Sequence, residues 1–454
     1  MTSLQTLGDC LLRCSSGFRA GVRRIPAAVL ALAATAAGAE TLDEAWRAAL
    51  AADARLAAAE TRTAASEAAL LAARAERSPN VTASTATTRW RDTPAFDFGG
   101  AGLPVALPLF GGKTVNVATA EVSLPLYTGG ALAADVTAAA AARDREMRLA
   151  DALRQDVLLG VADAYVGVLR AASALDVARS LSASLASHAR DVEDMRRTGQ
   201  VPTNDYLAAA VSLADARQRE LTAESALDVA RALYNRRLGR PFESPVAVEP
   251  LAEPLGGAAI AAPLPDLVAA ARASRPELEE LAAAADALDA RAAAARAARR
   301  PQLALSGGYA HLENDFLSRE DFWFASLGVR VNVFDGGRSR HASAALERQA
   351  AATESERRDR GAEIELEVRR AFAELTTARQ RVGVAAGAVQ QAEENLRVVR
   401  DRYRNGEGTN TEVLDAEALR ALSAGNFDTA RYDVRLAELK LARAVGALRL
   451  ESYR

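Results

Sequence analysis

The sequence predicts a mainly α-helical protein built from two copies of one repeat, in which each copy has two β-strands followed by a long helical hairpin. Three observations support this fold class. Short motifs recur at a constant offset of 207 residues, a helical pattern runs without interruption over residues 130–197 and 338–404, and apolar residues alternate with polar ones over residues 322–334. Alanine is abundant and aromatic residues make up only 5% of the chain, as expected where helices pack closely along their length.

The duplication is visible in three pairs of segments. LPLYTGG at 124–130 recurs as VNVFDGG at 331–337, and RRTGQVPTNDYL at 196–207 recurs as YRNGEGTNTEVL at 403–414. Gly239 and Gly446, which close the two copies, keep the same offset. Because such a repeat constrains the fold more strongly than any single motif, we expect both copies to form the same elements in the same order.

The first 39 residues have the layout of a secretory signal peptide. A basic stretch precedes an apolar run over residues 25–37, and small residues at 37–39 (AGA) form a cleavage site. We therefore expect export by the general secretory route and a mature chain that begins at Glu40.

Composition argues against several classes of function. Without the signal peptide, 52 basic and 58 acidic residues remain, and this net charge of −6 does not favour nucleic acid. Cys10 and Cys14 both precede the apolar run, so the mature protein would have no thiol, disulfide or lipid anchor. His188, His311 and His341 are isolated, without the spacing of metal ligands, and phosphate-binding and nucleophile motifs are missing from the sequence. We expect no enzymatic activity, no cofactor and no metal, and an interhelical position for His188.

The elements of each copy can be placed by their periodicity and their helix breakers. A helix over 42–77 and its counterpart over 266–300 each end close to a proline, which disfavours helix in the preceding residue. The first copy spans 40–239, with strands at about 80–90 and 113–127 and a hairpin over 130–239. A linker with six prolines follows at 240–265. The second copy spans 266–454, with strands at about 302–311 and 322–334 and a hairpin over 338–450.

One feature breaks this symmetry. The first copy carries 15 additional residues within the turn-rich stretch 91–113, which predicts a surface loop lengthened in one copy.

The helical pattern over residues 130–197 and 338–404 predicts two very long helices. A continuous helix of the predicted length would reach about 100 Å at 1.5 Å per residue. Such a helix needs neighbours along its length, and the antiparallel return helix of the hairpin supplies the first of them.

The predicted strands indicate how an exported chain of this kind would cross a membrane. After the signal peptide, consecutive apolar residues never approach the roughly 18 that a membrane helix needs, which leaves strands as the means of crossing. Four strands are too few for a closed barrel, since the smallest single-chain barrels use about eight, so several copies must share strands. Aromatic residues near the strands would form an interfacial girdle or, alternatively, fill a soluble sheet: Trp90, Phe96, Phe98, Phe316, Phe322, Trp323 and Phe324.

Over residues 42–448 the chain resembles the TolC family of outer membrane factors. The resemblance rests on the order and spacing of the paired repeats, the strand-end motifs LPLYTGG and VFDGG, and the second turn RYRNGEGTNTEVLD at 402–415. It implies a homotrimer whose protomers share a 12-stranded membrane β-barrel in the outer membrane, standing on an α-helical tunnel of long coiled-coil hairpins in the periplasm. It also implies two partners, a periplasmic adaptor and an inner-membrane pump of the RND or ABC class.

The function implied by the resemblance is a passive duct for the efflux of small molecules such as drugs, in a tripartite system driven by the pump. The outer-membrane channel of type I protein secretion is an alternative, since the pump selects the cargo. A periplasmic adaptor would carry one hairpin within a lipoyl-like β domain, whereas this sequence has two hairpins, each preceded by a strand pair. A coiled-coil scaffold conflicts with the alternating pattern of residues 322–334.

The turns of the two hairpins are the expected contacts for the adaptor, on the strength of the resemblance. Ordinary turn chemistry explains the same residue types, because glycine adopts left-handed geometry and Thr or Asn caps the following helix, and both interpretations can hold. The expected contact residues are Gly199, Gln200, Val201, Pro202, Thr203, Gly406, Glu407, Gly408, Thr409 and Asn410.

Glu412 and Asp415 are predicted to form a pore constriction with Tyr403. The two acidic residues are three apart and would share a helix face, so that symmetry would stack them as two acidic rings that favour cations. Alternatively, they are carboxylates stabilised by the dipole of a helix N-terminus. By the resemblance, Tyr403 matches a tyrosine of the closed-state latch, but Gly408 replaces its arginine partner. Other candidates for the latch are Arg196, Arg197, Arg402 and Arg404.

Overall fold

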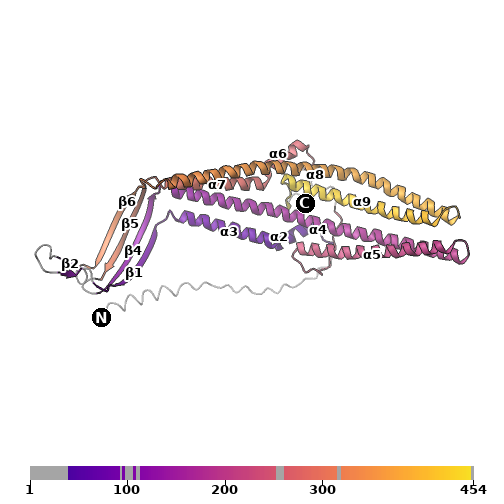
Figure 1. Ribbon diagram of the computed structural model, residues 1–454, viewed down its shortest axis with the longest axis horizontal. Helices are drawn as coiled ribbons and strands as arrows, with labels where there is room; N and C mark the ends of the chain where they lie inside the picture. The colour runs from indigo at the N-terminus through magenta and orange to yellow at the C-terminus, as the bar shows by residue number, and fades with distance from the viewer. Residues whose placement is uncertain are drawn as a thin grey trace. The chain divides into compact units, whose positions relative to one another are not determined.

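The computed structural model describes residues 39–92, 95–97, 106–108, 113–251, 260–313 and 319–450 (Figure 1). The predicted signal peptide up to residue 38, with both cysteines, lies outside these residues, as do parts of the linker and of the loop at 91–113. A compact unit begins at Glu40, the residue predicted to start the mature chain.

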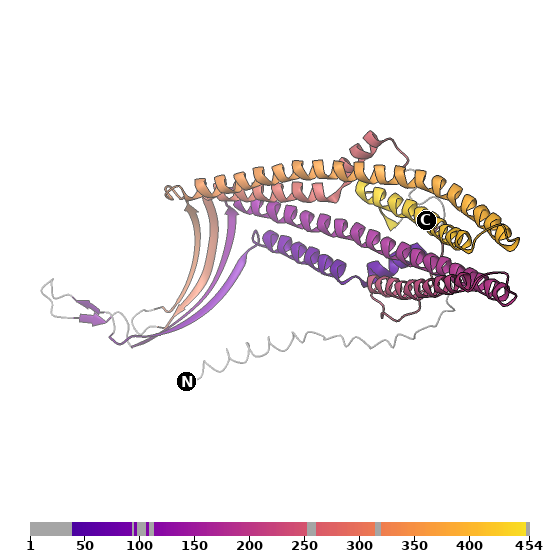
Figure 2. The ribbon, with the colours of Figure 1, turned by 45° about the vertical axis from the view of Figure 1, so that its right-hand side comes forward.

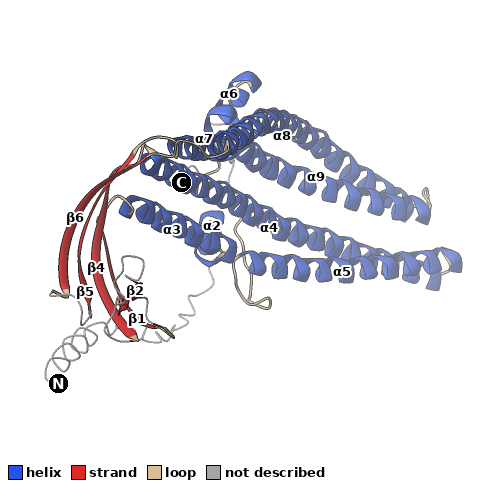
Figure 3. Ribbon diagram, turned by 60° about the vertical axis from the view of Figure 1, so that its left-hand side comes forward, coloured by secondary structure: helices blue, strands red, loops and turns tan. Residues whose placement is uncertain are grey.

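The unit that begins at Glu40 is mostly helical with a small sheet, as the sequence predicts, and the same elements occur twice (Figure 3). The helices are α2 (Leu42–Ala52), α3 (Ala54–Ala75), α4 (Ala131–Arg197), α5 (Thr203–Arg237), α6 (Leu264–Ser274), α7 (Pro276–Ala297), α8 (Arg338–Arg404) and α9 (Asn410–Val445). The strands are β1 (Asn80–Arg89), β2 (Ala95–Asp97), β3 (Ala106–Pro108), β4 (Thr114–Tyr127), β5 (Gln302–Leu312) and β6 (Asp321–Arg330).

The two longest helices, α4 and α8, have 67 residues each. Both begin directly after a Gly-Gly pair, and the second glycine caps the helix with left-handed geometry, at φ 94° for Gly130 and 87° for Gly337. A residue with a Cβ adopts that geometry at a cost, which explains the repeated motif. Each long helix packs antiparallel with its return helix, α5 or α9, and the turns of both hairpins lie at the end opposite the sheet (Figure 2).

The four long strands form one antiparallel sheet in the order β1-β4-β5-β6. The hairpins β1–β4 and β5–β6 come from the first and second copies, and the β4–β5 pair joins the two copies at the centre of the sheet. The lengthened loop of the first copy also contains the short antiparallel pair β2–β3. At the other end of the sheet, β4 runs into α4 through the first Gly-Gly pair.

The last strand is shorter than predicted, because β6 ends at Arg330 whereas the alternating pattern extends to Phe334. Arg330 pairs with Gln302, the first residue of β5. The residue before Gln302 is Pro301, which has no N–H group to continue the ladder. The pattern at 331–334 therefore lacks a strand partner on this side, and Val333 and Phe334 are each 86% exposed.

The two predicted helices at 42–77 and 266–300 are each broken into two, so the prediction of continuous helices was wrong. The first break is at Asp53, whose Oδ1 accepts hydrogen bonds from the N–H groups of Arg55 and Leu56 and caps α3. The second is at Arg275, which adopts an extended conformation because Pro276 follows it. Both breaks occur at the same place in the repeat.

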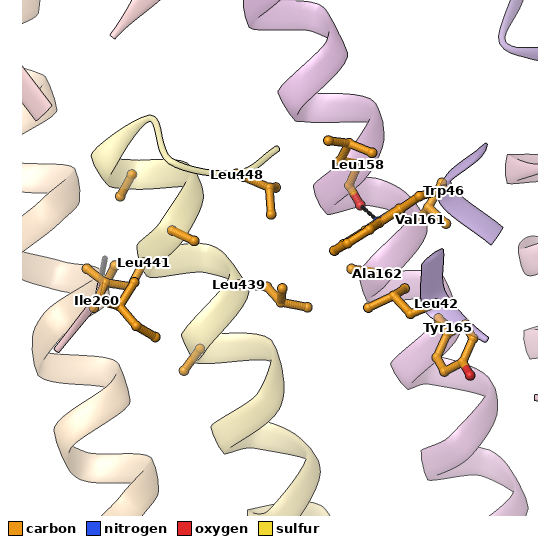
Figure 4. Close-up of a cluster of buried hydrophobic side chains, with 14 of the residues drawn as sticks. Leu42, Trp46, Leu158, Val161, Ala162, Tyr165, Ile260, Leu439, Leu441 and Leu448 are labelled. Carbon is orange, nitrogen blue, oxygen red and sulfur yellow. Dashed lines mark hydrogen bonds between the residues drawn. The ribbon is translucent and has the colours of Figure 1, made fainter. Parts of the chain in front are cut away.

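The main core lies where the two copies meet near the middle of the long helices. Trp46 is fully buried and donates a hydrogen bond from Nε1 to the carbonyl of Leu158 at 2.8 Å (Figure 4). Across the core, Leu439 and Leu448 of the second copy are equally buried. Among the described helices, α4 contains an 18-residue window apolar enough to cross a membrane by composition, with mean hydropathy 1.5, but 44% of that window is buried within the chain.

A network of ion pairs ties four elements together beside this core. The carboxylate of Glu277 in α7 accepts hydrogen bonds from Arg275 at 2.8 and 2.9 Å and from Arg443 of α9 at 2.7 Å. Arg443 also contacts Asp156 of α4, and Arg275 contacts Glu367 of α8. Burial raises the pKa of Glu277, but the two guanidinium groups outweigh burial and lower its pKa to about 2.

Candidate pore constriction and hairpin tips

The four-stranded sheet has one apolar face that is exposed in the protomer. In this face Trp323 and Val329 of β6 are 81% and 68% exposed. The side chains on the apolar face are Val81, Val122, Leu124, Leu305, Tyr309, Trp323, Leu327 and Val329. The opposite face is rich in hydroxyl groups, and the Oγ of Ser84 and the Oγ1 of Thr119 hydrogen-bond there at 2.8 Å. The edge strands β1 and β6 have no further strand partner among the described residues.

The aromatic residues near the strands are divided between the two faces of the sheet. Side chains alternate along a strand, so Trp323 lies on the apolar face whereas Phe322 and Phe324 lie on the opposite face. Trp90 directly follows β1 and is 39% exposed. The side chains of Phe96, Phe98 and Phe316 lie outside the part that the structure describes. The predicted single girdle therefore does not hold for Phe322 and Phe324.

The first turn, between α4 and α5, is closed by backbone hydrogen bonds. Gly199 has a φ of 76°, and the N–H of Gln200 donates to the carbonyl of Met195 at 2.8 Å. These features end α4 in the manner of a left-handed glycine cap. The remaining predicted contact residues of this turn are exposed, apart from half-buried Val201: Gln200, Pro202 and Thr203.

The second turn, between α8 and α9, has the same backbone design. Gly406 has a φ of 75°, and the N–H of Glu407 donates to the carbonyl of Arg402 at 2.9 Å. Thr409 caps α9 by accepting a hydrogen bond at Oγ1 from the N–H of Glu412 at 3.3 Å. Gly408 lies close to α8, where an added Cβ would come within 3.1 Å of a backbone nitrogen. Turn chemistry thus accounts for these residue types.

The two predicted pore acids differ in their surroundings. Glu412 is half-buried, and its carboxylate lies 3.7 Å from the guanidinium of Arg402. Asp415 is exposed, and it forms no ion pair with the residues that the structure describes. Glu412 belongs to the first turn of α9, where the helix dipole favours a carboxylate, and Asp415 lies in the second turn. The charge available to a pore is therefore greater at Asp415.

Tyr403, the third predicted pore residue, is buried within the protomer at 7% exposure. Its ring packs against His188 of α4 with the centroids 5.5 Å apart. Its hydroxyl is buried and lacks a hydrogen-bond partner among the described residues. Burial and the nearby charge of Asp205 both raise the pKa of Tyr403. A direct role of Tyr403 in a pore stays a prediction and would require this packing to change.

Asn410, a predicted tip residue, is 3% exposed and joins the two hairpins instead of facing outward. Its Oδ1 lies 2.7 Å from Nε2 of His188, and its Nδ2 donates to the carbonyl of Asp205 at 3.0 Å. These bonds connect the start of α9 with α4 and with the start of α5. His188 has the interhelical position that the sequence predicts.

The four arginines considered as candidates for the latch behave differently. Arg196 and Arg197 both bond to Glu193 within the first hairpin. Arg402 donates to the carbonyl of Glu407 at 3.0 Å within the second turn. Arg404 reaches the other hairpin, where its guanidinium lies 3.6 Å from Asp191, with side-chain exposures of 61% and 44%.

One polar cluster near the tip was missed in the sequence. Glu417 of α9 is fully buried, and its carboxylate accepts hydrogen bonds from Arg400 of α8 and, at 2.8 Å, from the hydroxyl of Ser184 of α4. The signal available was an acidic residue on the helix face that the apolar positions Val413 and Ala416 assign to the interior. Within the described parts of the chain, no group of three or more metal-binding side chains is found.

The profile of the outer membrane efflux protein family matches residues 45–239 and 267–447, that is, one block in each copy of the repeat. Among curated proteins, the outer membrane efflux protein BepC of Brucella suis biovar 1 (strain 1330) is 30% identical to this chain over 125 residues. The match covers 27% of this chain and 27% of BepC, so it spans about a quarter of that relative.

Solved structures with the same fold include two outer-membrane proteins. The outer-membrane channel OprN is 17% identical, with a TM-score of 0.75 and coverage of 89% of this chain and 90% of OprN. The outer membrane protein VceC from Vibrio cholerae is also 17% identical, with a TM-score of 0.76 and coverage of 89% and 96%. At this level of identity the likeness concerns the fold.

Proposed function

Because this chain belongs to the outer membrane efflux protein family, we propose that it is the outer-membrane channel of a tripartite export system for small molecules such as drugs. An inner-membrane pump of the RND or ABC class and a periplasmic adaptor complete the system, and the channel alters none of its cargo. The observation that carries the proposal is the combination, in one chain, of a sheet with an exposed apolar face and two hairpins built on 67-residue helices.

Three protomers supply the strands of one 12-stranded barrel. An exposed apolar face and two unpaired edges are unfavourable for a sheet in water, because the edges present free N–H and C=O groups. Pairing β1 of one protomer with β6 of the next removes every edge, as a membrane barrel requires. The apolar face then contacts lipid, and the hydroxyl-rich face lines the lumen.

The helical hairpins extend from the barrel into the periplasm as an α-helical tunnel. Residues 1–39 direct export and are removed, so the mature protein begins at Glu40. A helix of 67 residues spans about 100 Å, so the hairpins reach far into the periplasm. The exposed turn residues at 199–203 and 406–409 contact the adaptor.

The narrow end of the tunnel carries two acidic rings formed by Glu412 and Asp415 around the three-fold axis. Rings of carboxylates attract cations and repel anions. Because Arg402 lies near Glu412 and partly neutralises it, the ring of Asp415 dominates the selectivity. Tyr403 adds bulk beside the rings when the hairpins rearrange.

Outer-membrane fractionation with a native oligomer assay tests the function. The expected result is a heat-resistant trimer in detergent extracts of the outer membrane, with Glu40 as its N-terminal residue by mass spectrometry. Purified trimer should form cation-selective channels in a planar bilayer, and deletion of the gene should raise the cell's sensitivity to exported drugs. Recovery of soluble periplasmic monomer alone would contradict the proposal.

A further inference from the structure

We propose that a buried tie between the two hairpins, made by the side chains of His188 and Asn410 and the backbone carbonyl of Asp205, holds the tip of this channel together. This tip tie replaces a latch through the hydroxyl of Tyr403. The inference rests on the proposed channel function, because a change at the tip alters conductance only where the tip borders the pore.

The hydrogen bonds of the tip tie have one consistent arrangement. Nδ2 of Asn410 donates to the carbonyl of Asp205 at 3.0 Å, so Oδ1 is free to accept. His188 then donates from Nε2 to Oδ1 across 2.7 Å. His188 is 6% exposed and Asn410 is 3% exposed, so water competes little for these bonds. The tie connects α4 and α5 of the first hairpin with α9 of the second.

Other contacts at the tip are less suited to this role. The hydroxyl of Tyr403 has no partner among the described residues, and Gly408 has no side chain to offer it one. The ion pair between Arg404 and Asp191 crosses the hairpins at 3.6 Å but is exposed, and exposed ion pairs contribute little.

The cluster of Ser184, Arg400 and Glu417 also crosses the hairpins, one helical turn further from the tip on α4. Arg400 and Glu417 both belong to the second hairpin, so they would keep each other as partners if the hairpins parted. Only the bonds to Ser184 would be lost, and a serine hydroxyl is readily solvated. Although Glu417 is a buried charge, this cluster therefore adds little to the free energy needed to separate the two hairpins.

The packing allows the tip to part while the main core stays closed. The hydrophobic contacts at the tip form a separate cluster around Val192, Val399 and Val413. A second, smaller cluster of buried residues contains Leu181, Leu185 and Ala216. A groove between α4, α5 and α9, whose walls include Ala174 and Leu422, lies between these clusters and the main core. A local opening that breaks few contacts is favoured over one that disrupts the core.

Bilayer conductance of four purified variants at neutral pH tests the tip tie. Asn410→Leu removes both bonds with little change in volume, and His188→Phe breaks the first of them from the other hairpin. Loss of a net hydrogen bond shifts an equilibrium about fivefold, so we expect Asn410→Leu to raise the open probability on the order of 20-fold and His188→Phe about fivefold. Tyr403→Phe tests the rival latch, and we expect it to raise the open probability less than Asn410→Leu does. The control is Thr198→Val, which removes a hydroxyl that bonds only within α4 and should stay within about twofold of wild type.

The double variant separates a tie from general damage. If His188 and Asn410 act through one bond, adding His188→Phe to Asn410→Leu raises the open probability no further. The proposal is overturned if Asn410→Leu and His188→Phe both match wild type, if their effects multiply in the double variant, or if Tyr403→Phe opens the channel more than Asn410→Leu does. Trimers that insert into the bilayer but conduct in no variant would instead refute the channel function.

Discussion

The ion-pair network at Glu277 yields a stability prediction that can be worked out from the structure. Glu277→Gln removes the charge that Arg275 and Arg443 share, while the size of the side chain hardly changes. Against the raising effect of burial, the guanidinium groups of Arg275 and Arg443 lower the pKa of Glu277 from its ordinary value of 4.5 to about 2 in the folded protein. The side chain is 18% exposed, so solvent screens it little. One pKa unit corresponds to about 1.36 kcal/mol, so the charge of Glu277 contributes about 3 kcal/mol to the free energy of unfolding at neutral pH.

The pH dependence of this contribution follows from its sign. A carboxylate whose pKa is lowered on folding contributes its full stabilisation at pH values above the pKa that it has in the unfolded chain, here 4.5. The contribution is then lost progressively as the pH falls toward about 2. We therefore expect the difference in free energy of unfolding between wild type and Glu277→Gln to shrink from about 3 kcal/mol at pH 7 to about 1 kcal/mol at pH 3.

Thermal unfolding of the detergent-solubilised protein, followed by circular dichroism at a fixed scan rate, measures the effect. We expect Glu277→Gln to lower the apparent melting temperature by about 5 °C at pH 7. Glu279→Gln is the matched control, because Glu279 on the same helix pairs with Arg148 at 2.8 Å but is 43% exposed. That variant should change stability by less than about 1 kcal/mol. Equal shifts for the two variants, or a shift for Glu277→Gln that persists undiminished at pH 3, would refute the reasoning.

Three further predictions concern other parts of the chain. Gly129 and Gly336 share a φ of 65°, but of the two only Gly129 has another side chain, that of Arg300, within 2.6 Å of an added Cβ. Gly129→Ala should therefore lower the free energy of unfolding by about 1–3 kcal/mol more than Gly336→Ala does, as measured by thermal unfolding. Equal losses of stability in the two variants would contradict this. The combination of Glu412→Ala and Asp415→Ala should lower cation selectivity in reversal-potential measurements, and unchanged selectivity would exclude the acidic rings. Glu40→Ala breaks hydrogen bonds of 2.7–2.9 Å to Arg240 and Tyr234. Limited proteolysis should therefore cut the linker at 240–265 faster in this variant than in wild type. An equal rate of cleavage would show that these bonds do not hold the linker in place.

The features that the sequence predicts well are those that a local pattern determines. The lengths of α4 and α8 follow from an uninterrupted helical pattern, and their starts follow from Gly-Gly pairs that adopt left-handed geometry. The helix break at Asp53 was missed because a single aspartate is compatible with both a helix interior and a cap. The break before Pro276 could have been found, since proline restricts the residue that precedes it.

The features that local pattern cannot determine depend on contacts between distant residues. The end of β6 is set by its partner β5, which begins after Pro301, and not by the alternation in β6 itself. Likewise, the burial of Asn410 depends on His188, which is 222 residues away in the sequence. A turn motif alone therefore places Asn410 at a tip but leaves open which way its side chain faces.

The tips also show where the two copies of the repeat have diverged. Thr203 and Asn410 occupy equivalent positions, yet Thr203 is exposed whereas Asn410 is buried between the hairpins. One copy thus presents its turn to solvent, and the other uses the same position to hold the hairpins together. Because a partner can bind only residues that it can reach, the turn at 199–203 would offer the proposed adaptor more surface than the turn at 406–410 does. Substitutions at Gln200 should therefore weaken adaptor binding while leaving conductance unchanged. Substitutions at Asn410 should instead raise conductance while leaving adaptor binding unchanged.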